Sequence, residues 1–219
     1  MTTHLKIDFV SDVSCPWCAI GLASLEKALG RLAGEIDAEL HFQPFELNPE
    51  MGPDGQSMVE HIAEKYGSTP AQIESNQEMI RARGAEVGFQ FDMGKRQRIY
   101  NTFDAHRLLH WAHAEGKQSA LKHALFTAYF TNGRNVSDPE VLVDVAASVG
   151  LDPERARQIL AGSEYAQEVR QREHFYVERG IHAVPAVVIN GRHLVQGGQP
   201  VEAFEDVLRR VSPATMKHT

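Results

Sequence analysis

Apolar and polar positions give the start of the chain a clear pattern of elements. Residues 4–10 form a short apolar run typical of a buried strand, and residues 16–33 carry apolar side chains at helical spacing. Residues 38–45 alternate between apolar and polar side chains and predict a second strand. The chain therefore opens with strand, helix, strand, and the turn-rich residues 48–55 mark a boundary after them.

From about residue 56 to residue 178 the pattern is helical throughout. The expected helices cover residues 57–66, 70–83, 97–114, 118–130, 139–149, 152–160 and 163–179. Ser57 and Glu60 have the spacing of a capping box at the start of the first of them. Residues 88–92 are predicted to be extended or a loop. No internal repeat interrupts this helical block.

After Gly180 the pattern changes back to strands. Residues 186–189 predict a buried strand, Asn190-Gly191 is a strong hairpin signal, and residues 193–195 predict the returning strand. A helix is expected from residue 201 to residue 211. The chain thus ends with strand, strand, helix, as the counterpart of its opening.

The two cysteines lie where the first strand meets the first helix, in the sequence Cys15-Pro16-Trp17-Cys18. A sulfur at the start of a helix lies near the unpaired N–H groups of the first turn, which together with the helix dipole stabilise a thiolate. Pro16 suits the first helical position, where its missing N–H is no loss. A strand, a Cys-x-x-Cys motif and a helix in this order are typical of a thioredoxin-type redox dithiol.

Two structural interpretations of this cysteine pair compete with the redox one. Half of a zinc site is one, but a structural zinc ion needs four ligands and the chain has no second cysteine pair. A static disulfide is the other, but it would stabilise little, because the entropy it removes grows with the length of the closed loop. The flanking strand and helix favour the redox interpretation.

The predicted fold class is α/β, a thioredoxin-like fold with a large all-helical insertion. Residues 1–50 and 180–212 are expected to form the thioredoxin-like domain, and residues 51–179 the helical insertion domain. Pro185 is expected directly before the buried strand of residues 186–189 and not in its middle, because proline donates no hydrogen bond within a sheet. In such a fold this proline is cis and packs beside the Cys-x-x-Cys loop, which leaves the backbone of Val184 free to pair with a bound peptide or thiol.

Composition and charge narrow the function further. The net charge is −7 and no run of Lys or Arg occurs, which argues against a nucleic-acid partner. The sequence shows neither a signal-peptide pattern nor an apolar stretch of membrane-spanning length. We therefore expect a cytoplasmic protein, in which a disulfide is usually transient and catalytic.

Three stretches of the chain resemble the DsbA-like thioredoxin superfamily, and within it the cytoplasmic FrnE-like branch of disulfide oxidoreductases. They are the Cys-Pro-Trp-Cys motif, residues 183–200 and residues 101–108. The resemblance covers nearly the whole chain in order and length. It implies a thiol–disulfide oxidoreductase or disulfide isomerase that acts on protein or small-molecule thiols.

The resemblance also implies roles for individual residues. Cys15 is expected to be the accessible nucleophile, Cys18 the resolving cysteine buried behind it, and Pro185 the cis-proline. The substrate-binding residues are predicted to be Pro16, Trp17 and Val184. Trp17 is expected to be exposed, as an aromatic side chain between two cysteines at the entry of a helix.

Two other functions stay open beside the oxidoreductase. The related 2-hydroxychromene-2-carboxylate isomerases and kappa-class glutathione transferases share the architecture but generally have serine where Cys15 stands. A glutathione-dependent isomerase or transferase is therefore the alternative, and a non-enzymatic helical interaction protein is the third hypothesis. No cofactor is expected, and glutathione is left open as a thiol partner.

Three histidines form one further pattern. His106, His110 and His113 fall on one stripe of the expected helix, with a spacing compatible with metal binding. The glutamate of a catalytic zinc helix does not follow His106. We therefore expect no metal site, and the role of the stripe is left open.

Overall fold

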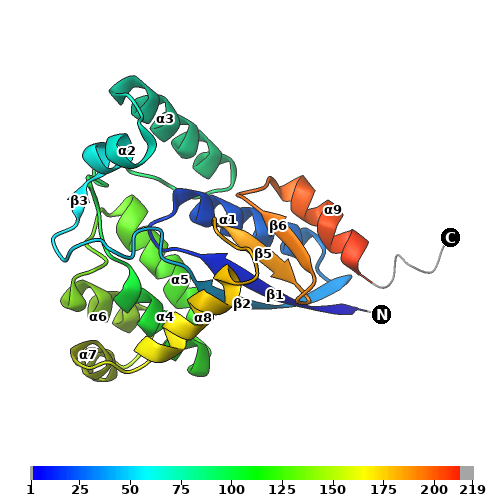
Figure 1. Cartoon of the computed structure of the whole chain (residues 1–219). Helices are drawn as coiled ribbons and strands as arrows, with labels where there is room; N and C mark the ends of the chain where they lie inside the picture. The colour runs from blue at the N-terminus through cyan, green and yellow to red at the C-terminus, as the bar shows by residue number, and fades with distance from the viewer. Residues whose placement is uncertain (1, 213–219) are drawn as a thin grey trace.

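A four-stranded sheet organises the fold, and the computed structural model describes residues 2–212 of the chain. The strand order is β2-β1-β5-β6 (Figure 1). The strands are β1 (Thr3–Ser11), β2 (Ile36–Pro44), β5 (Ala186–Ile189) and β6 (His193–Gln196). Strand β1 runs parallel to β2 and antiparallel to β5. The first and last segments of the chain therefore form one sheet, as the sequence pattern predicts.

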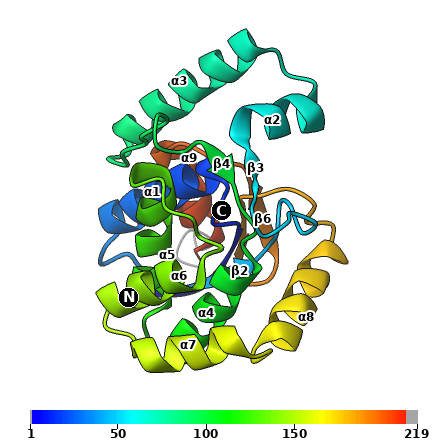
Figure 2. The same cartoon turned by 90° about the vertical axis from the view of Figure 1, so that its left-hand side faces the viewer.

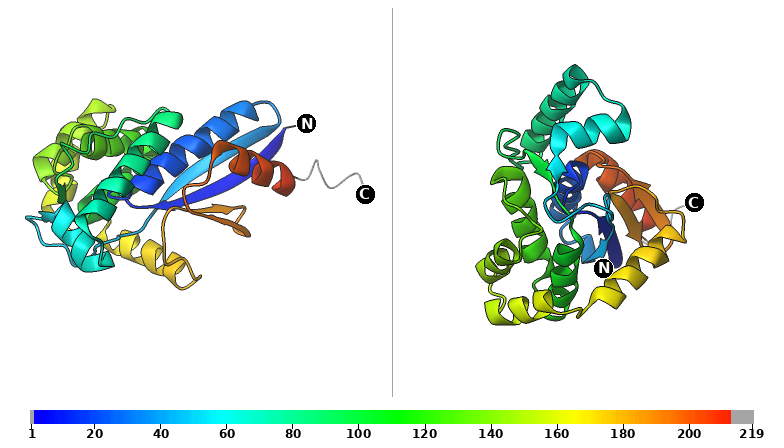
Figure 3. Two further views of the ribbon diagram at one scale, coloured as in Figure 1. Left: turned by 90° about the horizontal axis from the view of Figure 1, so that it is seen from above. Right: turned by 60° about the vertical axis from the view of Figure 1, so that its left-hand side comes forward.

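Helices α1 (Pro16–Arg31) and α9 (Val201–Val211) cover one face of this sheet (Figure 3). Helix α1 is the crossover that parallel pairing of β1 and β2 requires. Helix α9 buries Val201, Phe204 and Leu208, whose spacing places them on one side of a helix. The turn between β5 and β6 places Asn190 and Gly191 at φ 52° and 66°, which suits a hairpin turn of type I′.

The segment between β2 and β5 is mostly helical and packs at the carboxyl end of β1. Its helices are α2 (Met58–Tyr66), α3 (Pro70–Glu86), α4 (Phe103–Ala114), α5 (Gln118–Phe126), the π-helical turn η1 (Thr127–Thr131), α6 (Pro139–Ser148), α7 (Pro153–Ala161) and α8 (Ala166–Val177). Figure 2 shows α2 and α3 on one side of α1, and α4, α7 and α8 on the other.

Two local expectations for this segment were wrong. The helix expected from residue 97 begins only at Phe103, because β4 (Arg98–Ile99) pairs with β3 (Gln56–Ser57) in a small sheet. The insertion is thus not entirely helical. Ser57 makes no side-chain cap, whereas Thr69 and Gln72 form a reciprocal capping box at the start of α3.

The sheet and the helical segment share one hydrophobic core. Phe9 and Leu25 of the first elements belong to the same buried cluster as Leu108 and Phe130 of the insertion. Each such side chain contributes about 1.5–3 kcal/mol when it leaves water. The insertion and the sheet are therefore stabilised together, and the expected domain limits stay a prediction. Within residues 2–212 no helix combines the length and apolar character needed to cross a membrane.

Candidate redox site

Cys15 occupies the N-cap position of α1, with Pro16 in the first turn as expected. The backbone N–H of Cys18 donates to the Cys15 carbonyl over 3.1 Å, which starts the first turn. Both cysteines are free thiols. The motif therefore places the first sulfur at the positive end of the α1 dipole and the second one turn further in.

Sheet pairing brings the proline loop against this motif. Val10 of β1 lies opposite Ala186 of β5, so the residues just after Val10 and just before Ala186 are neighbours. The peptide bond between Val184 and Pro185 is cis, as predicted. The Cys15 thiol donates to the Val184 carbonyl over 3.7 Å. The Cys-x-x-Cys motif and the loop of the cis-proline therefore lie side by side, as the sequence analysis predicts.

Cys15 is not accessible in the way the sequence suggests. The residue is only 3% exposed, and it lines a cavity rather than an open surface. Cys18 is fully buried, as expected. Trp17, expected to be exposed, is half-buried and packs against the core. A substrate must therefore enter the cavity to reach the Cys15 sulfur.

The cavity has a volume of about 340 Å³ and lies between the motif and the helices α2 and α3. Pro16, Trp17 and Val184 line it together with Cys15, and their role in substrate binding stays a prediction. Its opposite wall includes the apolar side chains of Met58, Ile62, Ile73, Ile80 and Ile99. The insertion thus supplies a large apolar part of the surface that faces the dithiol.

Polar side chains of the insertion also line the cavity, namely those of His61, Tyr66, Ser68, Asn76, Gln77 and Arg96. Arg96 is 6% exposed, donates to the Ser14 carbonyl over 3.4 Å, and leaves its buried Nε without a hydrogen-bond partner among the described residues. Tyr66 is 61% exposed, and burial of its hydroxyl together with the nearby Cys15 raises its pKa. A cation and a hydroxyl group therefore interrupt the apolar wall near the dithiol.

Burial controls the ionisation of Cys18. Desolvation and the neighbouring Cys15 raise the pKa of the Cys18 thiol well above its ordinary value, while the charge of Lys122 acts in the opposite direction. Lys122 is itself fully buried on α5, and desolvation lowers the pKa of its ammonium group to about 8. A cation buried near Cys18 favours the thiolate that an exchange reaction needs.

The buried carboxylate of Asp12 shapes the loop before the motif. It accepts hydrogen bonds from Ser14 N over 3.2 Å and from Leu47 N over 2.7 Å. Burial alone would raise the pKa of Asp12, but its interactions with His106 and Leu47 outweigh that effect and lower it. Asp12 therefore stays charged and joins the loop of Cys15 to the end of β2.

Two glycines allow the segments of the site to approach closely. A Cβ atom on Gly21 of α1 would lie 3.2 Å from the Pro185 ring. A Cβ atom on Gly198 would lie 2.9 Å from the Trp17 carbonyl oxygen, which is nearer than real Cβ contacts allow. The motif, the cis-proline and the segment after β6 thus fit together only with small residues at these two positions.

The histidine stripe of α4 does not line the cavity of Cys15. His106 is buried, with its Nε2 atom 3.6 Å from Asp12 Oδ1 and 3.2 Å from the Phe45 carbonyl oxygen. His110 packs its ring 5.1 Å from that of Tyr165, and His113 is exposed. His106 therefore contacts Asp12, in the loop before the cysteine motif. All three histidines line a second cavity, which is described below.

Asp12, Arg96 and Lys122 are the residues that the sequence interpretation missed. Only Lys122 carried a recognisable signal: it stands between Leu121 and Leu125 on the face of α5 that the helical pattern predicts to be buried. A lysine at such a position predicts an unusual buried charge. Arg96 lies in a loop far from the motif in sequence, and only the fold brings it to the cavity.

Comparisons with known proteins agree with this geometry. A model of the DSBA-like thioredoxin domain matches residues 6–209. The chain is 29% identical over 209 residues to the protein YwbO of Bacillus subtilis, covering 95% of this chain and 96% of that protein. It is also similar to the crystal structure of a probable DsbA oxidoreductase, SCO1869, from Streptomyces coelicolor. That similarity has a TM-score of 0.90 at 34% identity and covers 99% of this chain and 92% of the other.

A more distant solved structure shows the same fold. The cytosolic disulfide reductase DsbM from Pseudomonas aeruginosa, solved with GSH, gives a TM-score of 0.64 at 17% identity, with 94% of this chain and 98% of that chain covered. The match to the family model spans the sheet, the helical insertion and both segments of the redox site. This chain therefore belongs to the family of proteins with a DSBA-like thioredoxin domain.

Proposed function

We propose that this protein is a thiol–disulfide oxidoreductase in which Cys15 attacks and Cys18 resolves. The Cys15 thiolate bonds to one sulfur of a substrate disulfide, and the other sulfur leaves as a thiolate that takes up a proton. The Cys18 thiolate then attacks the Cys15 sulfur and releases the second substrate thiol. The substrate gains two electrons, and the dithiol becomes the Cys15–Cys18 disulfide. The reverse sequence oxidises a substrate dithiol.

One observation carries this proposal: the Cys15 sulfur lies at the N-terminus of α1 and 3.7 Å from the carbonyl before the cis-proline. The helix terminus stabilises the attacking thiolate. The backbone of Val184, just before β5, offers hydrogen bonds to a chain or thiol that enters the cavity. The buried Lys122 stabilises the Cys18 thiolate against the desolvation that opposes it. The two cysteines thus have unequal environments that suit unequal roles.

The cavity indicates the class of substrate. Its apolar wall from α2 and α3 suits a protein or peptide segment, or a small disulfide with apolar parts. Arg96 adds a buried cation that suits a carboxylate, so an anionic thiol such as glutathione is included in the proposal. A place in the cytoplasmic FrnE-like branch is part of the same proposal, supported by the resemblance of the motif and by the low cysteine content.

Reduction of insulin disulfides by dithiothreitol tests the oxidoreductase, with the precipitation of the insulin B chain as the readout. We expect the wild-type protein to accelerate it and Cys15→Ser to abolish the acceleration. Gly30→Ala is a matched control on α1, since nothing lies within 4 Å of the added methyl group. Full activity of Cys15→Ser would overturn the proposal. Turnover of 2-hydroxychromene-2-carboxylate with glutathione, without insulin reduction, would establish the isomerase instead.

A further inference from the structure

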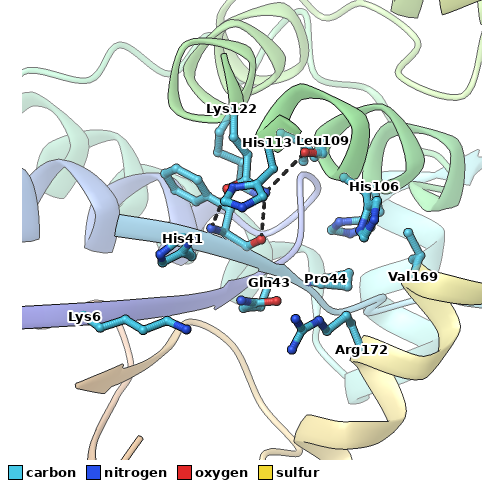
Figure 4. A pocket seen from close by; sticks show the side chains of 13 residues that line it. Lys6, His41, Gln43, Pro44, His106, Leu109, His113, Lys122, Val169 and Arg172 are labelled. Atoms are coloured by element: carbon cyan, nitrogen blue, oxygen red, sulfur yellow. Dashed lines mark hydrogen bonds between the residues drawn. The ribbon is translucent and has the colours of Figure 1, made fainter. Parts of the chain in front are cut away.

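A second cavity, of about 140 Å³, lies beside β2 and away from the cavity of Cys15. Residues from β1, β2, α4, α5 and α8 form its walls, and Figure 4 shows their side chains around it. Exposed side chains at its mouth come from Lys6, His113 and Arg172. Buried ones at its base come from His106 and Lys122. The proposed redox reaction uses none of the residues at the mouth.

The lining of this cavity is cationic although the chain as a whole has a net charge of −7. Among the described residues that line it, three are lysine or arginine, four are histidine, and none is acidic. Of the carboxylates just outside, Glu168 of α8 acts electrostatically on His110, and three others have partners. Asp12 lies beside His106, Asp8 accepts a hydrogen bond from Gln43, and Glu39 lies 3.0 Å from His41.

The strongest single sign of a ligand is Lys122. Its side chain is fully buried, lines the cavity, and within residues 2–212 its Nζ atom has no hydrogen-bond partner. The ring of Phe126 lies 4.9 Å from this atom, and Cys18, Asp12 and Cys15 are near enough to act on it electrostatically. A buried ammonium group without a hydrogen-bond partner is costly, even where nearby charges offset part of that cost. An anion in the cavity would supply the missing partner.

The composition of the cavity selects an anion over a metal ion. In the described part of the chain no group of three His, Cys, Asp or Glu side chains is arranged to hold a metal. The cationic side chains of Lys6, Lys122 and Arg172 would repel a metal cation. The same groups, with the N–H donors of the imidazoles, match the oxygens of a phosphate group. The cavity is smaller than typical pockets for drug-sized ligands, so the ligand must be small.

We propose that this cavity binds a small phosphate-type oxyanion, either inorganic phosphate or the phosphate group of a small monoester. Lys122 neutralises it from the buried side, and Arg172 holds it at the mouth. The proposal does not depend on the redox function, because binding requires neither cysteine to react. It does connect the two sites in space, since Lys122 lines this cavity and also acts electrostatically on Cys18.

Isothermal titration calorimetry of the reduced protein, in a buffer free of phosphate and sulfate at pH 7, tests the proposal. The probes are inorganic phosphate, methyl phosphate and acetate. We expect both phosphates, or inorganic phosphate alone, to bind at least about tenfold more tightly than acetate, because a dianion gains more from this lining. Binding of methyl phosphate would identify a monoester as the ligand class, and its failure to bind would identify the free anion.

Three variants complete the test. Arg172→Gln changes an exposed side chain, so it should fold normally and weaken phosphate binding by about tenfold. Lys122→Met should weaken it at least as much. Arg192→Gln, in the exposed turn before β6, is the matched control and should bind like the wild type. Added phosphate should also shift the imidazole resonances of His113 in NMR spectra.

The absence of binding heat and of any His113 shift would overturn the proposal. Equal binding of acetate and phosphate would overturn it as well, and so would equal weakening in Arg172→Gln and Arg192→Gln. Insulin reduction measured on the same samples reports the redox function separately. An inactive protein that binds phosphate would refute only the oxidoreductase, and an active protein that does not bind phosphate would refute only this inference.

Discussion

The Cys15 thiol and the Val184 carbonyl lie 3.7 Å apart, although 169 positions separate the two residues in sequence. The thiol donates to the carbonyl, so this contact belongs to the protonated form of Cys15. When the thiolate forms, the donor is lost and the N–H groups at the start of α1 remain as its nearest stabilising partners. The Val184 carbonyl then becomes free to accept a hydrogen bond from a substrate backbone. In the proposed reaction, deprotonation of Cys15 therefore both forms the nucleophile and frees the Val184 carbonyl to bind the substrate.

The first prediction concerns the unequal roles of the cysteines. Cys18→Ser should still attack a disulfide through Cys15 but should then stall as a mixed disulfide, because the resolving thiol is missing. Mass spectrometry after incubation with oxidised glutathione should show one glutathione adduct on Cys15. The matched variant Cys15→Ser should form none, since burial raises the pKa of the remaining Cys18 thiol. An adduct on Cys18 in Cys15→Ser, with Cys15 inert in Cys18→Ser, would reverse the assignment.

The second prediction concerns the free energy of unfolding and Lys122. Its pKa of about 8 in the folded protein, against 10.5 for an unperturbed lysine, means that charging Lys122 destabilises the fold by on the order of 3 kcal/mol at neutral pH. Replacing Lys122 with methionine, of similar length and uncharged, should therefore raise the unfolding free energy by about 1–3 kcal/mol at pH 7 in phosphate-free buffer.

The pH dependence distinguishes this cause from a simple packing effect. The penalty is fully present below about pH 8, where folded Lys122 is charged. It declines as the pH rises toward 10.5, because the folded state loses this proton before the unfolded state does. The advantage of Lys122→Met should fade over that window in urea unfolding curves. A Cys15→Ser, Cys18→Ser background removes the titrating thiols. An advantage that stays constant up to pH 10.5 would contradict this explanation.

The third prediction tests the close contact at Gly198. A methyl group there would lie 2.9 Å from a backbone oxygen of the motif, so Gly198→Ala must displace Trp17 or the segment after β6. We expect a loss of about 1–3 kcal/mol in unfolding free energy and slower insulin reduction. Gly30→Ala is the control: it adds the same methyl group to the exposed side of α1 and should stabilise by about 0.5–1 kcal/mol. Unchanged activity in Gly198→Ala would show that the contact does not position the motif.

The fourth prediction addresses the charge of the substrate. Arg96→Met removes the buried cation of the Cys15 cavity but keeps an apolar stem over the rings of Tyr129 and Phe130. The second-order rate with oxidised glutathione, which carries carboxylates, should fall about tenfold. The rate with the neutral hydroxyethyl disulfide is the internal control and should change by less than about threefold. Equal losses with both substrates would assign Arg96 a structural role only.

The sequence alone predicted the strands and helices around the site better than the burial of the side chains within it. Short-range patterns were sufficient for the strand before Cys15, the helix after Pro16 and the hairpin at Asn190, because each depends on residues close together in the chain. The burial of Cys15 was not predicted. It depends on neighbours distant in sequence, such as Val184, and hydrophobic periodicity does not tell which distant segments pack together.

The start of α4 shows a second limit of the sequence pattern. Residues 97–102 have side chains compatible with a helix, yet the backbone of Arg98 and Ile99 pairs with a distant segment instead. Asn101 then accepts a hydrogen bond from the N–H of Phe103 and starts the helix there. A long-range pairing thus replaced a local preference, which single-sequence patterns do not reveal.

The antiparallel pairing of β1 with β5 also determines when the protein becomes active during its synthesis. Cys15 and Cys18 leave the ribosome early, but Val184 and Pro185 follow only after the whole helical insertion has been made. Until then β1 lacks its neighbour, and the dithiol has neither its carbonyl partner nor its proline loop. A growing chain therefore carries two thiols without the site that directs them. In the proposed oxidoreductase, the complete redox site therefore forms only once the C-terminal strands have paired with β1.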